Sequence, residues 1–286
     1  MILRLLSKAD IPAAKRLWHT CFPEDSEAFL DWFFVSGRRP ELSAGCFEGD
    51  RLLSAMHGSV MPLTQGDTTV PALMVSGVAT EPAERGKGLM HRTMLYLKEK
   101  AAERGIHVLF NHPQDPNAYK RLGYLPCTDT LYFEESAAFC ARADGEPLRQ
   151  VPFYEKTALG IYTQLSKRYN AFSTRDANEF SQRVRELTLD GGEALLFYEG
   201  DSPAAYCLYH KEGSLTVADE ILSLAGYAPV LKAVCGVTDC ERIRAKLPPD
   251  TPLPGERRVQ NIMLADPAAY AAFAYGKACC YAVDEY

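Results

Sequence analysis

Two glycines and two basic residues stand together in the stretch Val75 to Met90, which reads VSGVATEPAERGKGLM. Arg85 and Lys87 alternate with Gly86 and Gly88, and apolar residues at helical spacing follow, so a helix is predicted to begin directly after this loop. The first N–H groups of a helix have no partner within the helix and lie at the positive end of its dipole. Glycine lets a phosphate approach the backbone closely, and the two cations add charge. The loop therefore predicts an anion site that suits a diphosphate.

The spacing of these residues excludes two common nucleotide motifs. GxGxxG would need a third glycine where the chain has His91, and the Walker string GxxxxGK[ST] is absent. The string that is present, V-A-T-x-P-x-x-R-G-K-G-L, resembles the acetyl-coenzyme A motif of the GNAT acetyltransferase superfamily. That family's R-x-x-G-x-G/A pattern falls on Arg85, Gly88 and position 90, where this chain departs by having Met90. We expect this methionine to alter packing below the loop more than phosphate binding. The alternative is a plain strand-turn-helix whose glycines only close a turn.

A second motif follows about thirty residues later, in the sequence DPNAYKRLGY. It predicts a short helix capped by Asp115, with Pro116 at its first position and Gly123 just after its end. Tyr119, Gly123 and Tyr124 resemble the second GNAT signature, A-x-x-x-Y-x-x-x-G-F/Y. Two signatures in the family's order assign residues 1 to about 138 to the superfamily.

The resemblance implies acetyl-CoA as co-substrate and direct attack of a primary amine on the thioester, without a covalent intermediate. It implies that the strand ending Val78-Ala79-Thr80 splays from a strand at 106–110 and leaves part of its backbone exposed. Pantetheine would pair with this exposed backbone, and the N–H near Val78 would face the thioester oxygen. Tyr119 would protonate the departing thiolate, or else only line the CoA channel. Asn111 would bond pantetheine, or else satisfy the backbone at its strand end. The cofactor-binding residues implied are Val78, Ala79, Thr80, Arg85, Gly86, Lys87, Gly88, Leu89, Met90, Asn111 and Tyr119.

No side chain is an obvious general base. Glu81, just past the Val-Ala-Thr strand, is one candidate, although a purely structural turn also fits there. The C-terminal carboxylate of Tyr286 is another, because in Eis-type GNAT enzymes the chain end reaches the active site of the first domain; a tail packed on its own domain is the alternative. Glu24, Asp25 and Glu27, between the first two predicted helices, could attract an amine or simply favour the dipole of the next helix. A water relay would need no residue.

The elements that must position these residues follow the GNAT order β-α-α-β-β-β-α-β. The expected fold class is therefore α/β (α+β), a GNAT fold with a mixed, splayed sheet. Hydrophobic periodicity and turn residues predict strands at 2–6, 44–47, 51–60, 75–80 and 106–110, and helices at 11–21, from 26 to 37 and from 90 to 104.

The composition shifts at 139–152, and beyond this stretch the same order of predicted helices and strands begins again. Glu199-Gly200-Asp201 repeats Glu48-Gly49-Asp50, and Val217-Ala218-Asp219-Glu220 echoes Val78-Ala79-Thr80-Glu81. No R-G-K-G equivalent follows the second echo, so we expect no diphosphate site there. The tandem resembles Eis-type acetyltransferases, without their sterol-carrier-like third domain, for which 286 residues leave no room. An unrelated α+β domain is the alternative. The predicted units are a GNAT domain at 1–138, a linker at 139–152 and a degenerate GNAT-like domain at 153–286.

The composition of the chain limits the kinds of molecule that we expect the protein to bind. The net charge is −6 and no basic stripe interleaved with aromatics occurs, which argues against nucleic acid. The nine cysteines lack CxxC or metal spacing, so we expect reduced thiols and no metal. No signal peptide or membrane span is recognised, which predicts a cytoplasmic protein without a membrane partner. We expect a small-molecule or peptide amine acceptor, and a homo-oligomer is compatible with the sequence. The competing function is a non-catalytic acyl-CoA binding module whose second domain recruits a partner.

Overall fold

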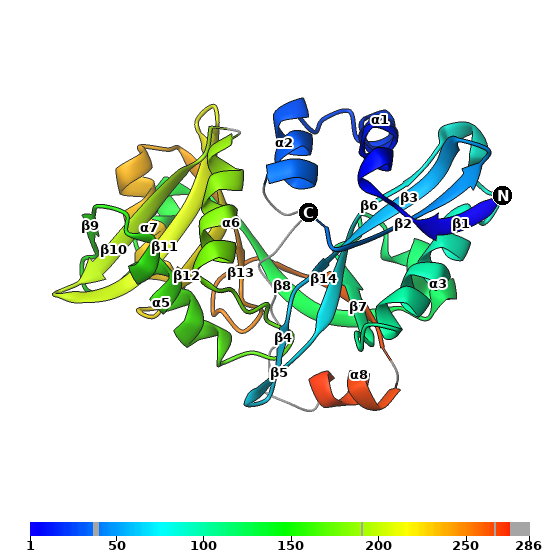
Figure 1. The fold of residues 1–286 in the computed structure, drawn as a ribbon. Helices are drawn as coiled ribbons and strands as arrows, with labels where there is room; N and C mark the ends of the chain where they lie inside the picture. Colours follow the sequence, from blue (N-terminus) through cyan, green and yellow to red (C-terminus); the bar gives the residue numbers. More distant parts are fainter. Residues whose placement is uncertain (37–39, 190, 266, 275–286) are drawn as a thin grey trace.

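The computed structural model describes residues 1–36, 40–189, 191–265 and 267–274. A twelve-stranded sheet runs through it in the order β1-β2-β3-β6-β7-β14-β8-β13-β12-β11-β10-β9. Figure 1 shows this sheet reaching from β1 on the right to β9 on the left. Its strands are β1 (Ile2–Leu5), β2 (Leu42–Glu48), β3 (Arg51–Val60), β6 (Ala72–Thr80), β7 (Val108–Asn111), β8 (Leu125–Ser136), β9 (Arg149–Val151), β10 (Glu193–Glu199), β11 (Ser202–Glu212), β12 (Leu215–Ser223), β13 (Arg242–Leu247) and β14 (Glu256–Leu264), while β4 (Leu63–Gln65) and β5 (Thr68–Val70) form a separate hairpin.

Helices cover both faces of the N-terminal part of the sheet. Neighbouring residues of a strand point to opposite faces, and on β3 Ala55 packs against Leu17 of α1 whereas Met56 packs against Met94 of α3. The two helices therefore lie on opposite sides of the same strands. The helices are α1 (Ile11–Cys21), α2 (Glu27–Asp31), α3 (Leu89–Ala102), α4 (Ala137–Cys140), α5 (Glu155–Ser166), α6 (Ala177–Leu189), α7 (Tyr227–Thr238) and α8 (Pro267–Ala274), with 3-10 turns at Lys8–Asp10, Pro82–Glu84 and Pro116–Leu122 and a π-helical turn at Trp32–Ser36.

The predicted mixed α/β fold with a splayed sheet is confirmed, and the predicted strands and helices of residues 1–138 all occur. The boundaries differ by a few residues, as they commonly do at the ends of elements. The second helix is shorter than predicted, because α2 ends at Asp31 and the chain continues as a π-helical turn to Ser36.

The two halves of the sheet have the same strand order when each is followed from its outer edge toward the centre. Read inward, β1-β2-β3-β6-β7 on one side corresponds to β9-β10-β11-β12-β13 on the other. In each half the fourth and fifth strands pair in parallel and are joined by a helix, α3 or α7. The Glu-Gly-Asp turns at 48–50 and 199–201 join β2 to β3 and β10 to β11. The two halves thus have the same connectivity.

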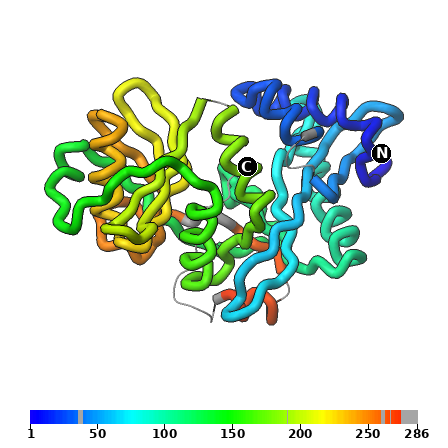
Figure 2. The backbone as a smooth tube through the Cα atoms, turned by 60° about the vertical axis from the view of Figure 1, so that its left-hand side comes forward, coloured from blue at the N-terminus to red at the C-terminus, as the bar shows by residue number. Residues whose placement is uncertain are grey.

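The last strand of each half is exchanged with the other half. β14 lies against β7, β8 lies against β13, and β8 and β14 pair with each other at the centre. The sheet is therefore continuous across both halves, and residues 139–152 contain the end of α4 and all of β9. The halves also meet where α6 runs beside the N-terminal half (Figure 2). Trp32 there donates its indole N–H to the Oε1 of Gln182 in α6 at 3.2 Å.

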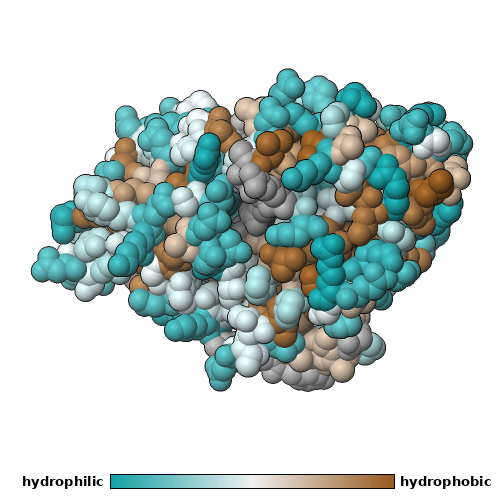
Figure 3. All heavy atoms as spheres, in the orientation of Figure 1, coloured by the Kyte–Doolittle hydropathy of each residue, from teal (hydrophilic) through white to brown (hydrophobic). Residues whose placement is uncertain are grey.

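The surface is unevenly polar. Figure 3 shows larger groups of hydrophobic residues to the right of centre, over the N-terminal half, than to the left. Among the described residues, five of the eight large hydrophobic side chains that are exposed belong to that half: Met1, Ile2, Val35, Leu95 and Leu125. No helix in the described parts of the chain is both long and apolar enough to cross a membrane. The seven described cysteines are free thiols.

Candidate active site

β6 and β7 lie side by side only at their first residues. Their pairing ends at Met74 and Phe110, after which β6 continues to Thr80 while β7 ends at Asn111. From Val75 onward, the edge of β6 that faces away from β3 has no strand partner among the described residues. The N–H and C=O groups of such an edge are available to an extended chain that adds itself as a further strand. This is the splay that the sequence predicts.

A bulge shapes β6 at the splay. Gly77 and Val78 together stand opposite the single residue Met56 of β3, which makes the local chain bend and twist. Gly77 has a φ of 54°, and a Cβ built on it would lie 2.1 Å from the ring of Trp18. Only glycine combines this backbone conformation with so close a contact. The bulge therefore sets the direction of Val78 and allows Trp18 to pack beneath it.

A cavity of about 360 Å³ opens at the splay. One wall is β6 from Val75 to Val78, and a second is the chain from Asn111 to Asp115 that leaves β7. Tyr119 comes from the 3-10 turn that follows, and the connection between α1 and α2 closes the cavity from the other side. Three predicted site residues, Val78, Asn111 and Tyr119, are thus brought to one cavity although they are far apart in the sequence.

Tyr119 is well placed to hold a proton in this cavity. Its side chain is 8 % exposed, and burial raises the pKa of its hydroxyl to about 12, although a hydrogen bond from the Asn111 side chain opposes the rise. Asn111 is itself buried, and its Oδ1 has no hydrogen-bond partner among the described residues. Tyr124 packs edge-on against Tyr119 and donates its hydroxyl to the Sδ of Met94 at 3.2 Å. Tyr124 is therefore a core residue.

The turn that carries Tyr119 begins at its predicted cap. The carboxylate of Asp115 accepts the backbone N–H of Asn117 at 2.9 Å, and Gly123 ends the turn with a φ of 86°. The structure is a seven-residue 3-10 helix where a short helix was expected.

We expect Asp115→Ala to lower the free energy of unfolding by about 1 kcal/mol, because a turn N–H loses its cap. Urea denaturation measures this change. Asp144→Ala is the matched control, since Asp144 is exposed and caps no described helix. A stability equal to that of the wild-type protein would contradict the capping role.

The glycine-rich loop connects the end of β6 to α3. Gly86 and Gly88 have φ values of 78° and 75°, and nothing lies within 4 Å of a Cβ built on either, so the loop surface is open. Arg85 donates its Nε–H to the carbonyl of Thr80 at 3.2 Å, and the Lys87 ammonium lies 2.7 Å from the Glu84 carboxylate. The loop therefore presents two cations beside an accessible helix start.

The residues on both sides of the glycine-rich loop pack into the protein or hold β6 against β3. Leu89 is buried, and Met90 packs against the core between α3 and the sheet, below the loop as expected. Ala79 is buried, and its carbonyl accepts the hydroxyl of Ser54, which also bonds the Thr80 hydroxyl. These contacts hold the end of β6 against β3.

Of the two predicted bases, only Glu81 belongs to the described residues. Glu81 follows β6, donates its backbone N–H to the Leu53 carbonyl and is absent from the cavity lining described above. Tyr286 lies outside the described residues. Among the acidic residues between α1 and α2, Glu24 and Asp25 line the cavity, whereas Glu27 does not.

Trp18 is a cavity residue that the sequence did not single out. Its indole N–H donates to the Oδ2 of Asp25 at 2.6 Å, which fixes one carboxylate oxygen at the cavity wall. In the sequence Trp18 is one of several apolar residues on the inner face of a helix. The single sequence signal for its role is Gly77, an isolated glycine inside the strand 75–80. Such a glycine often marks a bulge or a place where another group packs closely against the strand backbone.

Comparisons with known proteins agree with this geometry. Residues 3–127 match the family model of the acetyltransferase (GNAT) domain. An uncharacterized N-acetyltransferase of Streptomyces griseus is 31 % identical over 151 residues, a match covering 49 % of this chain and 36 % of the relative. The chain therefore spans little more than a third of that relative's length.

Two solved structures share the fold over nearly the whole chain. A conserved protein of unknown function from Enterococcus faecalis V583, described as a probable N-acyltransferase, superposes with a TM-score of 0.76 at 13 % identity, covering 92 % of this chain and 72 % of its own. Eis1 from Mycobacterium abscessus gives a TM-score of 0.70 at 16 % identity, covering 94 % of this chain and 74 % of its own. The family match therefore covers residues 3–127, which include the splayed β6–β7 pair and the glycine-rich loop, and the two solved structures show that the fold of nearly the whole chain is shared.

Proposed function

We propose that this protein is an acetyl-CoA-dependent N-acetyltransferase that acts on a primary amine, either a small cationic molecule or a lysine side chain. One observation carries the proposal: the unpaired edge of β6 and Tyr119 face the same cavity, and β6 leads directly into the loop Arg85–Gly88. In this proposal the thioester of the donor lies along β6, with the hydroxyl of Tyr119 facing it across the cavity and the diphosphate at the loop that follows the strand.

In the proposed complex, acetyl-CoA lies along β6. Its diphosphate binds at the N-terminus of α3, where free N–H groups, Arg85 and Lys87 favour negative charge. Lys87 then exchanges its contact with Glu84 for a phosphate. Pantetheine adds to the open edge of β6, as an extended chain does in strand addition. The unpartnered Oδ1 of Asn111 is an acceptor for one of its amide N–H groups.

In the proposed reaction one C–N bond forms and one C–S bond breaks. The free amine attacks the thioester carbon, and the N–H near Val78 stabilises the developing oxyanion. The C–S bond then breaks, and Tyr119 protonates the sulfur of CoA. The proton that the attacking nitrogen loses can pass to water in the open cavity, so this scheme requires no side-chain base. Glu81 and Tyr286 remain predictions for that role.

The acceptor is proposed to bind beside Asp25. The indole of Trp18 holds one oxygen of this carboxylate, and Glu24 adds a second negative charge at the same wall. An ammonium group entering the cavity is attracted by both charges, and the aromatic side chains of Trp18 and Phe22 suit its apolar part.

We expect Asp25→Asn to raise the acceptor KM by roughly tenfold, because a charge-assisted contact is replaced by a neutral one. Steady-state kinetics with a cationic amine measure the change, and the CoA affinity should not move. Glu27→Gln is the matched control, since it removes a charge from the same connection outside the cavity. An equal KM for the two variants would remove Asp25 from the acceptor site.

The decisive experiment is the release of free thiol from acetyl-CoA in the presence of a panel of amines. Acceptor-dependent release supports the enzyme. Tight CoA binding without release from any amine, small or peptidic, would instead favour the acyl-CoA binding module.

We further propose that the chain consists of a GNAT domain at 1–138, a linker at 139–152 and a degenerate copy at 153–286. The repeated strand order supports this division. The copy contains no loop of the R-G-K-G type between β12 and α7. It therefore offers no comparable site for a diphosphate.

A further inference from the structure

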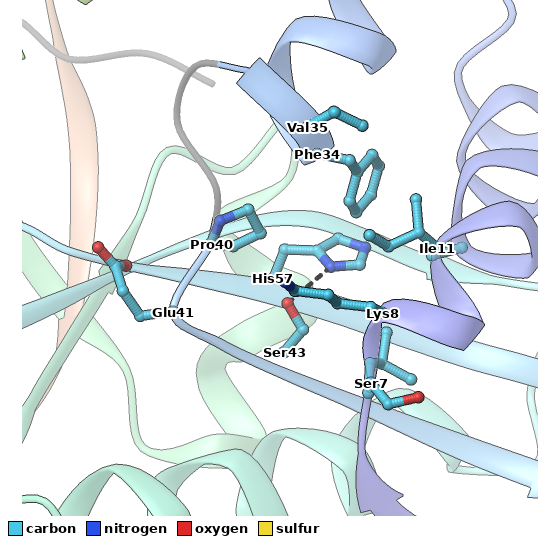
Figure 4. Close-up of a pocket in the computed structure, with 11 residues that line it drawn as sticks. Ser7, Lys8, Ile11, Phe34, Val35, Pro40, Glu41, Ser43 and His57 are labelled. Carbon is cyan, nitrogen blue, oxygen red and sulfur yellow. Dashed lines mark hydrogen bonds between the residues drawn. The ribbon is translucent and has the colours of Figure 1, made fainter.

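The N-terminal half contains a second cavity, of about 410 Å³. It lies between the start of α1, the end of the π-helical turn and the start of β2, and His57 of β3 forms its floor (Figure 4). Its described lining residues and those of the catalytic cavity have no member in common. The two cavities are separated by a stacked pair of rings, His57 and Trp18, whose centroids are 5.5 Å apart.

His57 presents an unused polar atom to this cavity. The residue is 1 % exposed, and its Nδ1 lies 3.0 Å from the Ser43 hydroxyl. Its Nε2 makes no hydrogen bond with any described residue, and Figure 4 shows the ring between Phe34, Ile11 and Lys8. Burial lowers the pKa of His57 to about 3, so the ring is neutral at physiological pH. A ring nitrogen that reaches a cavity without a hydrogen bond to the protein is available to a ligand.

The charge at the mouth of the cavity is positive. Lys8 extends along the opening in Figure 4 and forms no ion pair with a described residue. The carboxylate of Glu41 points away from the cavity, because its Oε2 accepts the backbone N–H of Val60 at 2.8 Å. The remaining wall is apolar and consists mainly of Leu6, Ile11, Ala14, Phe34, Val35 and Pro40.

We propose that this cavity binds a small carboxylic acid with a compact apolar body. The carboxylate accepts hydrogen bonds from Lys8 and from the Nε2–H of His57, and the apolar body packs against Phe34 and Ile11. The proposal assigns the Ser43 hydroxyl, 3.0 Å from Nδ1, as the donor of that hydrogen bond, which places the ring proton on Nε2, where it faces the ligand. A cationic ligand would meet Lys8, and a wholly apolar ligand would leave Nε2 without a partner.

Benzoate is a suitable probe, and benzamide is its neutral analogue of the same shape. In calorimetric titrations of the full chain we expect benzoate to bind about tenfold more tightly than benzamide. Lys8→Met should weaken benzoate binding about tenfold and leave benzamide binding unchanged, because it removes a charge and keeps the side-chain length. Lys156→Met, at an exposed lysine of α5, is the control that should change neither affinity.

His57→Phe tests the floor of the cavity, because it keeps the ring packing on Trp18 and removes Nε2. It should weaken the binding of both probes. Benzoate should also shift the NMR signal of the Trp18 indole N–H, and its affinity should be the same in the presence of saturating CoA. Failure of benzoate to bind, equal affinities for the two probes, undiminished binding to Lys8→Met, or competition with CoA would each overturn the proposal. If His57→Phe does not fold, the result for Lys8→Met decides. None of these measurements depends on acetyltransferase activity.

Discussion

Tyr119→Phe is expected to lower kcat about 10²-fold and to leave the affinity for CoA unchanged, because it removes the proton donor and keeps the ring. Tyr119 lies at the cavity where β6 loses its neighbour, and its ring packs against Tyr124. The substitution therefore changes one hydroxyl and little of the packing. Thiol-release kinetics and calorimetry with CoA measure the two quantities separately.

Tyr124→Phe is the matched control. Its hydroxyl is bonded to Met94 inside the core, so kcat should stay close to that of the wild-type protein. The pH profile gives a second check. A tyrosine donates a proton only while its hydroxyl is protonated, and the pKa of Tyr119 is raised to about 12. The pH at which the enzyme begins to lose activity should therefore lie roughly two units above the pH at which an ordinary tyrosine ionises. An unchanged kcat in Tyr119→Phe would leave Tyr119 as a lining residue of the CoA channel.

Replacing Arg85 and Lys87 together by alanine is expected to weaken CoA binding roughly 10- to 100-fold, because two cations beside the start of α3 are lost. Both side chains are exposed, so salt screens part of their effect, and the loss should be largest at low ionic strength. Calorimetric titration at two salt concentrations measures it. The backbone of the loop, with its two positive-φ glycines, remains intact in this variant.

A double variant of Lys98 and Lys156 to alanine changes the net charge by the same amount away from the loop and should leave CoA binding unchanged. The titration also counts the sites. We expect one CoA per chain, since β12 leads into α7 without an R-G-K-G loop. Two sites per chain, or full affinity in the Arg85/Lys87 variant, would remove the basis for the proposed cofactor site.

Most of the elements of residues 1–138 could be predicted because they are determined locally. Alternation, helical spacing, the Asp115 cap and the Gly88 helix start act over a few residues, and each is visible in a single sequence. The glycine-rich loop and the turn that carries Tyr119 were predicted in this way. The Glu-Gly-Asp repeat similarly marked the same hairpin in both halves of the sheet.

The parts that could not be predicted depend on residues far apart in the chain. Nothing local in β8 or β14 indicates that each pairs with the other half, because strand pairing is decided by which edges meet in the folded sheet. The absence of Glu81 from the cavity lining follows from the course of β6, which carries it beyond the splay.

The sequence by itself indicated the resemblance to GNAT acetyltransferases, the glycine-rich loop, the proton-donor candidate and the order of elements, since these are properties of short segments with their own conformational preferences. Only the tertiary structure decided that Trp18 holds Asp25 at the acceptor wall and that His57 and Lys8 frame a separate cavity. The physical reason is that both arrangements depend on the Gly77 bulge. The bulge lets α1 approach the sheet closely enough for the indole to stack on a histidine of another strand, and a contact of that kind exists only after the helix has packed on the sheet.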